Sequence, residues 1–499
     1  MIAPETFSTI DVAHEARIRR WSATVNPARS DIGQRIAVGP ADESEPPPGL
    51  HVAGGVPLRV ALLTINDARV EHAGRGALLA SAAEIIVELR SDDGRSFGER
   101  ASALRDARPD LAFVLAGDHN ADSVVELCEA LRYACSDVHP QPRVIVSGDA
   151  KSAQRLDRVL SSFSREIVPD ARHEDGRAAA VDRLRAFRRG TNVALVLRDE
   201  ALESLALAVA RDAGVAAAVV DVSGSSTSLV HADPGGAIVA AHLVPLGSGR
   251  GADRVVARAG LDRVRRWIPR PVDAPGLLER VFNRARWPDA IAVDPLALTL
   301  EIALAHEAIA HALADAGATG TLPERFRSAP VVVLTGRLAE LPRAAQSLLV
   351  AANALRPAVI ATVFRDRDDA LVSLGGIAAA LKMRYGHDLE AIAGRTETHR
   401  ALLGVVVPVN ASRPATVRVT GGATFAEQVA PGGFFALAAS GAVQVIVSGG
   451  LRGRGIAGPL GVLIDARGTP LVLPPRDAER VPAVARWFAA LDALADAAA

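Results

Sequence analysis

Lysine, cysteine and aromatic residues are scarce in this chain of 499 residues. Lys151 and Lys382 are the only lysines, so nearly all 56 basic residues are arginine. Neither lysine follows a glycine, which excludes the phosphate-binding loop G-x-x-x-x-G-K-[ST]. The formal net charge is -1. A chain without a basic excess has no overall electrostatic reason to bind the phosphate backbone, so we expect no nucleic-acid partner.

Two cysteines, Cys128 and Cys135, lie seven residues apart in a segment with a helical pattern. On one helix they would be about 10 Å apart, too far for a disulfide. Two thiolates also cannot form a four-cysteine zinc site. We therefore predict buried thiols in a reducing compartment. The N-terminus has no apolar signal core, and no uncharged run of about 18 residues occurs elsewhere. These absences predict a cytoplasmic protein that does not span a membrane.

Short apolar runs alternate with helical patterns rich in Ala, Leu and Arg, which is typical of an α/β protein with buried parallel strands. The sequence predicts five parts. Residues 1–48 are expected to be weakly structured. The Pro-rich segment 39–49 is expected to be the linker to the first lobe. Residues 49–190 and 191–395 are predicted as two α/β lobes. Short strands between Gly-rich turns predict an all-β domain over residues 396–480, and residues 481–499 a closing helix.

The most informative motif follows an apolar strand that ends in Asp221. A tight turn of glycine and hydroxyl residues comes next, formed by Ser223, Gly224, Ser225, Ser226 and Thr227. Small residues let backbone N–H groups approach a phosphate, and hydroxyls add donors. A carboxylate at the strand end can hold Mg²⁺ through water, so Asp221 is the candidate metal residue. The alternative is an ordinary serine-rich β-hairpin turn.

Two further segments are candidates for the same site. Gly247 and Gly249 belong to a glycine-rich loop before a helix, a place where phosphates can bind. Thr335 and Gly336 end the apolar strand that begins near residue 331. A plain turn is the alternative for each segment. No catalytic residue can be assigned, because the sequence contains neither a nucleophile elbow G-x-S-x-G nor the metalloprotease pattern H-E-x-x-H.

Residues 219–231 resemble the phosphate segment V-D-V-G-G-A-T-T-D-V of the glutamate mutase L (MutL) family. Four other blocks are similar in the same order, at residues 53–59, 109–118, 144–149 and 374–376. The family belongs to the superfamily of actin, heat-shock protein and sugar-kinase ATPases (ASKHA). The resemblance implies a two-lobed actin-like fold, ATP or ADP with Mg²⁺ as ligand, and an adenosylcobalamin-dependent mutase as protein partner. In that setting the L protein would be an ATP-dependent chaperone or reactivating factor.

The chain departs from the family pattern at the phosphate sites. The first phosphate hairpin, D-x-G-S-T-x-T-K, has no counterpart in residues 1–50, so we expect an actin-like fold that is incomplete at the N-terminus. Ser223 replaces a glycine and Ser228 replaces an aspartate of the second hairpin. Because in-line phosphoryl transfer needs phosphate and metal held together, ATP turnover should be weak at most.

Three functions remain open from the sequence. The first is a degenerate actin-like protein, a pseudo-ATPase that binds nucleotide or serves as a scaffold. The second is an active ATP-dependent reactivase, supported by the surviving pattern Asp-x-x-Gly-x-x-Thr that starts at Asp221. The third is a structural or regulatory interaction protein without a ligand.

Overall fold

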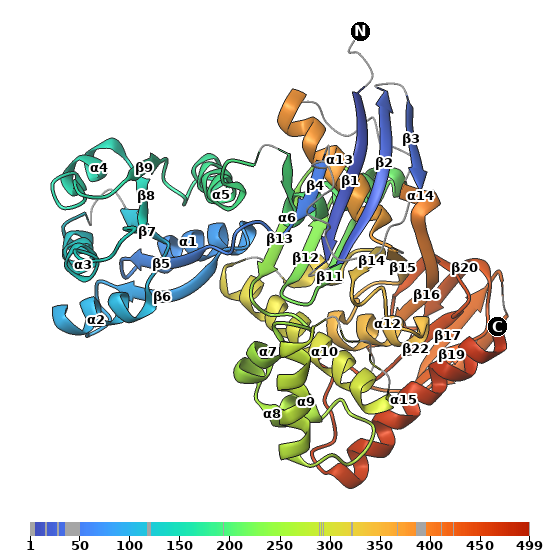
Figure 1. Cartoon of the computed structure of the whole chain (residues 1–499). Helices are drawn as coiled ribbons and strands as arrows, with labels where there is room; N and C mark the ends of the chain where they lie inside the picture. The colour runs from blue at the N-terminus through green and yellow to red at the C-terminus, as the bar shows by residue number, and fades with distance from the viewer. Residues whose placement is uncertain are drawn as a thin grey trace.

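The structure is a computed structural model in which four β-sheets and their covering helices form a body with one projecting unit (Figure 1). It describes residues 5–14, 17–26, 29–34, 50–116, 121–192, 194–288, 290, 292, 294–320, 323–366, 368–385, 396–410, 412–422 and 424–498. For residues 5–34 only the backbone is described.

The N-terminal sheet has the strand order β10-β4-β1-β2-β3. Its first three strands form an antiparallel meander, while β4 runs parallel to β1, and β10 parallel to β4. The strands are β1 (Glu5–His14), β2 (Arg17–Asn26), β3 (Arg29–Gln34), β4 (Leu50–Ala53) and β10 (Leu195–Leu197).

The N-terminal segment therefore contradicts the expectation of a weakly structured region. Residues 5–34 are three strands, and β1 and β2 form the hairpin that was expected to be missing. These strands pair with one another, and β1 also pairs with β4, which follows residues 35–49 in the sequence, so a local pattern does not reveal the sheet. The hairpin is present, but its sequence at residues 14–17, His-Glu-Ala-Arg, lacks the glycine and hydroxyl residues of a phosphate turn. The predicted linker lies outside the described residues.

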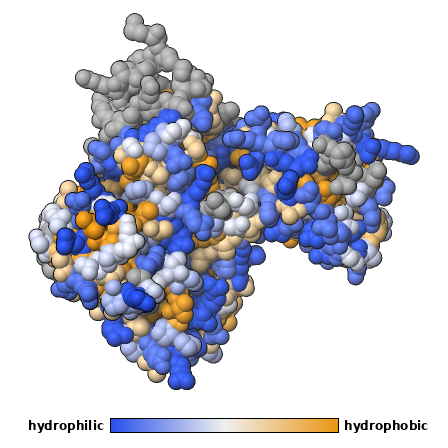
Figure 2. Space-filling view, turned by 180° about the vertical axis from the view of Figure 1, so that it is seen from behind, coloured by the Kyte–Doolittle hydropathy of each residue, from blue (hydrophilic) through white to orange (hydrophobic). Residues whose placement is uncertain are grey.

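An α/β unit is inserted between β4 and β10, and Figure 2 shows it projecting from the rest of the molecule. Its five strands are all parallel, in the order β6-β5-β7-β8-β9, around a hydrophobic core of their own. The strands are β5 (Arg59–Thr64), β6 (Glu84–Arg90), β7 (Leu111–Ala116), β8 (Arg143–Gly148) and β9 (Arg165–Val168). The helices are α1 (Ala68–Ala80), α2 (Phe97–Ala107), α3 (Ala121–Ala134), α4 (Ala150–Leu156) and α5 (Glu174–Arg189).

The inserted unit corrects the predicted domain boundaries. Residues 49–190 are not a complete lobe, because the strands of the first lobe come from both sides of the insertion. The boundary at residue 191 separates β10 from the sheet that it joins. Both cysteines lie buried and unbonded in this unit, as predicted, and burial raises the pKa of Cys128 to about 12.

The central sheet repeats the topology of the N-terminal sheet. Strands β11, β12 and β13 form an antiparallel meander, β14 runs parallel to β11, and β15 parallel to β14. The strands are β11 (Ala217–Val222), β12 (Thr227–Ala232), β13 (Ile238–Leu243), β14 (Val331–Gly336) and β15 (Ala361–Asp366). The sequence-based prediction of these five strands is confirmed to within a few residues. The chain thus contains two copies of one five-stranded arrangement.

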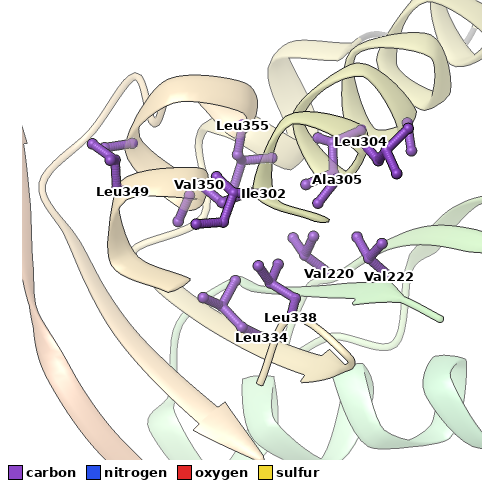
Figure 3. Packing of buried hydrophobic residues seen from close by; sticks show 14 of the residues in the cluster. Val220, Val222, Ile302, Leu304, Ala305, Leu334, Leu338, Leu349, Val350 and Leu355 are labelled. Atoms are coloured by element: carbon purple, nitrogen blue, oxygen red, sulfur yellow. The ribbon is translucent and has the colours of Figure 1, made fainter. Parts of the chain in front are cut away.

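Helices cover both faces of the central sheet. Alternate residues of β11 face opposite cores: Val219 packs with α6 (Arg198–Ala213) and α13 (Ala370–Tyr385), whereas Val220 and Val222 pack on the other face. Figure 3 shows Val220 and Val222 with Leu334 facing Ile302, Leu304 and Ala305 of α10 (Pro295–Ala318). The same core includes α12 (Ala344–Val350), the π-helix η1 (Ala351–Leu355), α7 (Ala252–Ala259), α8 (Leu261–Arg265), α9 (Ala274–Arg286) and α11 (Pro323–Arg327).

Among the described residues, one helix is long and apolar enough to cross a membrane, namely α10. Of its most apolar window, 61% is buried inside the fold. Ile302, Leu304 and Ile309 are completely enclosed by the sheet and its neighbouring helices. Helix α10 is therefore apolar because it is a core helix.

The C-terminal region contains the predicted short strands, but the separate all-β domain is not confirmed. Three of its strands, β16, β22 and β19, extend the central sheet beyond β15 to a total of eight strands. The other four form a sheet in the order β18-β17-β20-β21, which shares a core with β16 and β22. The elements are α14 (Thr396–His399), β16 (Arg400–Pro408), β17 (Ala415–Thr420), β18 (Phe425–Val429), β19 (Phe434–Leu437), β20 (Gly441–Val447), β21 (Arg452–Ala457), β22 (Val462–Asp465) and α15 (Asp477–Ala498).

Helices α6 and α13 join the two copies, because their shared core contains residues of both the N-terminal and the central sheets. The helices touch at Gly375. A Cβ atom added there would lie 3.0 Å from the carbonyl carbon of Ala201 and 3.0 Å from Cβ of Leu205. Gly375 therefore lets the two helices cross at backbone contact, whereas a Cβ atom on Gly376 would meet the side chain of Val52 in β4.

We predict that Gly375→Ala destabilises the chain by about 1–3 kcal/mol, because the added methyl group overpacks the crossing by more than the roughly 1 kcal/mol that alanine gains in a helix. Gly76→Ala in α1 is the matched control, since its nearest neighbour would be 3.9 Å away. The control should be neutral or stabilising. Urea unfolding midpoints measure both, and equal midpoints for the two variants would contradict the helix crossing.

Candidate functional site

The predicted site residues converge at the carboxyl ends of β11 and β14. The strands are in register, so Asp221 lies beside Thr335 and Val222 beside Gly336. The β11–β12 turn, residues 223–226, follows directly, and Thr227 begins β12. Gly247 and Gly249 lie in the loop of residues 247–251, which packs on this turn. All ten predicted residues are thus neighbours in space, although three separate segments contribute them.

The β11–β12 turn is closed by its own hydrogen bonds. The Ser223 N–H donates to the carbonyl oxygen of Ser226 at 2.8 Å. The N–H groups of Ser225 and Ser226 donate to the Ser223 hydroxyl oxygen at 3.3 and 3.0 Å. These N–H groups were predicted to hold a phosphate. The side chain of Ser223, which replaces a glycine of the family pattern, accepts their hydrogen bonds in its place.

The loop of residues 247–251 binds the back of the turn. The N–H groups of Gly249 and Gly251 both donate to the carbonyl oxygen of Gly224, at 3.0 and 2.8 Å. The Thr227 hydroxyl donates to the carbonyl oxygen of Leu246 at 2.9 Å. A Cβ atom on Gly247 would lie 2.6 Å from the carbonyl carbon of Gly224. The glycines of this loop therefore allow two backbone segments to pack closely.

Asp221 is completely buried and forms an ion pair with Arg198, the first residue of α6. The Arg198 Nε and Nη2 atoms donate to the two carboxylate oxygens at 3.1 and 2.8 Å. Asp221 points this way because alternate residues of β11 face α6 and α13. A carboxylate whose two oxygens accept bonds from one guanidinium does not fit the predicted Mg²⁺ ligand.

Arg198 makes a third bond, from Nη2 to Asp369 at 3.3 Å. Its side chain is 8% exposed, and those of Asp221 and Asp369 are 0% and 2% exposed. Burial by itself would lower the pKa of Arg198, but the two carboxylates raise it overall. Arg198 therefore remains a cation that links the start of α6, the end of β11 and the residue before α13.

Thr335 also has a partner inside the protein. Its hydroxyl donates to Asp366 at 3.2 Å, and Asp366 accepts the N–H groups of Leu371 at 2.9 Å and Val372 at 3.2 Å. Burial and the neighbouring Asp369 raise the pKa of Asp366 to about 8. Asp366 is therefore mostly protonated at neutral pH. The strand end that was a candidate part of the ligand site is occupied by this hydrogen-bonded network.

A second buried ion cluster lies next to the site and was not predicted. It joins α5 of the inserted unit to α6. Asp199 accepts bonds from Arg185 at 3.0 Å and from Arg188 at 2.7 Å, and Arg185 also donates to Glu203 at 2.6 Å. Sequence spacing offered a signal, because the arginines are three residues apart on one helix and the acids four apart on another. A cavity of about 100 Å³ separates this cluster from the β11–β12 turn.

Among the residues that the structure describes, no group of three or more His, Cys, Asp or Glu side chains could hold a metal ion. Residues 118–120, Asp-His-Asn, belong to one of the blocks that resemble the family and lie outside the described part of the chain.

No protein-family model matches this chain, and no curated protein matches it. Among solved structures, the nucleotide-free structure of acetone carboxylase from a study of ATP-dependent acetone carboxylation is 10% identical, covering 75% of this chain and 70% of that chain, with a TM-score of 0.28. An exopolyphosphatase-like protein is 13% identical over 78% of this chain and 98% of its own, with a TM-score of 0.22. A Ppx/GppA family member from Aquifex aeolicus is 10% identical, covering 76% of this chain and 90% of its own, with a TM-score of 0.19. TM-scores this low do not establish a shared fold.

The raised pKa of Asp366 predicts a specific pH dependence of stability. Between the ordinary aspartate pKa and about 8, the unfolded chain releases a proton that the folded chain keeps. This group therefore lowers the free energy of unfolding as pH rises, by up to about 1.4 kcal/mol per pH unit. Asp366→Asn removes the titration, so its stability relative to the wild type should increase from pH 5 to pH 8. Urea unfolding at both pH values measures the change, and a constant difference would contradict the assignment.

Proposed function

We propose that the chain is an actin-like, two-lobed protein with a closed phosphate site, and that it acts as a scaffold rather than as an ATP hydrolase. The observation that carries this proposal is that the Arg198 guanidinium donates hydrogen bonds to both carboxylate oxygens of Asp221. It replaces the divalent cation that an ATPase of this kind would place near the phosphates.

The repeated sheet topology supports the actin-like part of the proposal. Both the N-terminal and the central sheets consist of a three-stranded meander followed by two parallel strands, and helices α6 and α13 lie between them. The hairpins β1–β2 and β11–β12 occupy equivalent positions in the two copies. A fold with this internal repeat has the two hairpins that an actin-like ATPase uses for phosphates.

The chemistry of the hairpins supports the second part. Phosphoryl transfer depends on donors and cations that are free to stabilise charge on the transferred group. In the β11–β12 turn the N–H groups of Ser225 and Ser226 already bind the Ser223 hydroxyl. Residues 14–17 of the β1–β2 hairpin supply no glycine or hydroxyl group. The architecture is therefore retained while the groups needed for hydrolysis are engaged or replaced.

The partner proposed for this scaffold is the one that the family resemblance implies, an adenosylcobalamin-dependent mutase. The active reactivase is the second candidate function, because the pattern Asp-x-x-Gly-x-x-Thr and the other predicted residues meet at one place. That function requires Arg198 to leave Asp221, which would deprive this buried carboxylate of the guanidinium that binds both of its oxygens. The cost of such a step, about 3–5 kcal/mol, favours the closed scaffold.

Isothermal titration calorimetry with ATP, in Mg²⁺ and in EDTA, tests the proposal. We expect no Mg²⁺-dependent binding at millimolar ATP, and no change when Asp221 is replaced in Asp221→Asn. Asp233→Asn, at an aspartate in the β12–β13 turn whose side chain is 43% exposed, is the matched control. Tight Mg-ATP binding that is lost in Asp221→Asn and kept in Asp233→Asn would refute the closed site and establish the reactivase.

A further inference from the structure

A groove of about 530 Å³ lies between the inserted unit and the central sheet. Helix α1 and strand β6 form one wall, and the end of β13, helix α7 and the end of α10 form the other. Its volume is within the range of small-molecule sites. No residue of the β11–β12 turn lines it, so the groove is separate from the closed phosphate site.

The floor of the groove is apolar and its rim is charged. Apolar side chains come from both walls: Leu79, Ala83, Leu243, Val244, Leu246, Ala257 and Ala318. Ile85 adds a side chain that is 37% exposed, which is unusual for a large aliphatic residue beside a cavity. A site with this composition favours a ligand with an apolar body and a few charged groups.

Each wall carries charges that are already engaged in ion pairs. On the inserted unit, Arg75 Nη2 binds Glu88 at 2.6 Å and Glu71 at 3.1 Å. On the opposite wall, Arg258 binds Asp315. A ligand could reach these charges only by breaking a contact within one wall.

Two further charges line the groove, a carboxylate on one wall and a guanidinium on the other. Glu84 lies at the start of β6, and Arg254 lies on α7 across the groove. The two interact through space, but within the part of the chain that the structure describes neither forms an ion pair. Burial raises the pKa of Glu84, with Arg254 and Arg59 opposing that effect. A partly buried carboxylate without a partner is costly, and a ligand cation would offset that cost.

We propose that this groove binds a small zwitterion with an apolar body, either a free amino acid or a short peptide. Its anionic group binds Arg254, its cationic group binds Glu84, and its apolar body covers the leucines of the floor. Because the charges stand on opposite walls, the bound ligand holds the inserted unit against the rest of the protein. The site goes beyond the scaffold function and does not depend on it.

Calorimetry on the full chain tests the site with four probes. L-leucine represents the free amino acid and the dipeptide Leu-Leu the peptide source. N-acetyl-leucine lacks the cation, and leucine amide lacks the anion. We expect leucine or the dipeptide to bind, and both blocked probes to bind at least tenfold more weakly. Binding of the dipeptide alone assigns the peptide, and binding of leucine alone assigns the amino acid.

Variants at the two charges complete the test. Glu84→Gln and Arg254→Gln should each weaken binding at least tenfold, whereas Arg69→Gln, on an exposed part of α1 outside the groove, should not. The double exchange Glu84→Arg with Arg254→Glu should restore binding, because the ligand can turn around. The proposal is overturned if neither zwitterion binds at about 10 mM. A dissociation constant above that concentration means a binding free energy weaker than roughly 3 kcal/mol. Equal binding to wild type and both single variants overturns it as well. Neither result bears on the ATP experiment.

Discussion

The buried Arg198 guanidinium is the group that ties together the central sheet and the two helices, α6 and α13, that lie between the two sheet copies. It stands at the start of α6, binds Asp221 at the end of β11, and reaches Asp369 immediately before α13. Buried charges are stable only while opposite charges lie beside them. Truncating Arg198 would remove the guanidinium that binds both oxygens of the buried Asp221, at a cost of about 3–5 kcal/mol. The same contacts that fix the helices also remove Asp221 from metal chemistry.

Two other features act at the same junction. Gly375 brings α13 to backbone contact with α6, so the residues at the start of both helices lie close together. Arg185 and Arg188 bind Asp199, the residue after Arg198, and thereby attach the inserted unit to α6. Helix α6 is therefore held from three sides. A groove that opens between the inserted unit and the central sheet adds a place where a ligand could influence this attachment.

Local sequence patterns predicted the central sheet and the convergence of the site, because strands β11, β14 and β15 are continuous apolar runs bounded by turns. They did not reveal β1–β3, which pair with one another and, through β1, with β4 on the other side of residues 35–49. Arg198 was also missed. It lies 23 residues before Asp221, and no spacing rule connects a helix start to a strand end. The serine at residue 223 was recognised as a departure, but only the structure shows its hydroxyl accepting the N–H groups of the turn.

The most direct test of a closed phosphate site is a crystal structure grown with Mg²⁺ and a non-hydrolysable ATP analogue. We expect that both Asp221 oxygens still accept bonds from Arg198, and that Ser225 and Ser226 still donate to the Ser223 hydroxyl. A structure in which Arg198 has turned away would contradict it, if Asp221 then faced a nucleotide-bound Mg²⁺ and the turn N–H groups bound its phosphates.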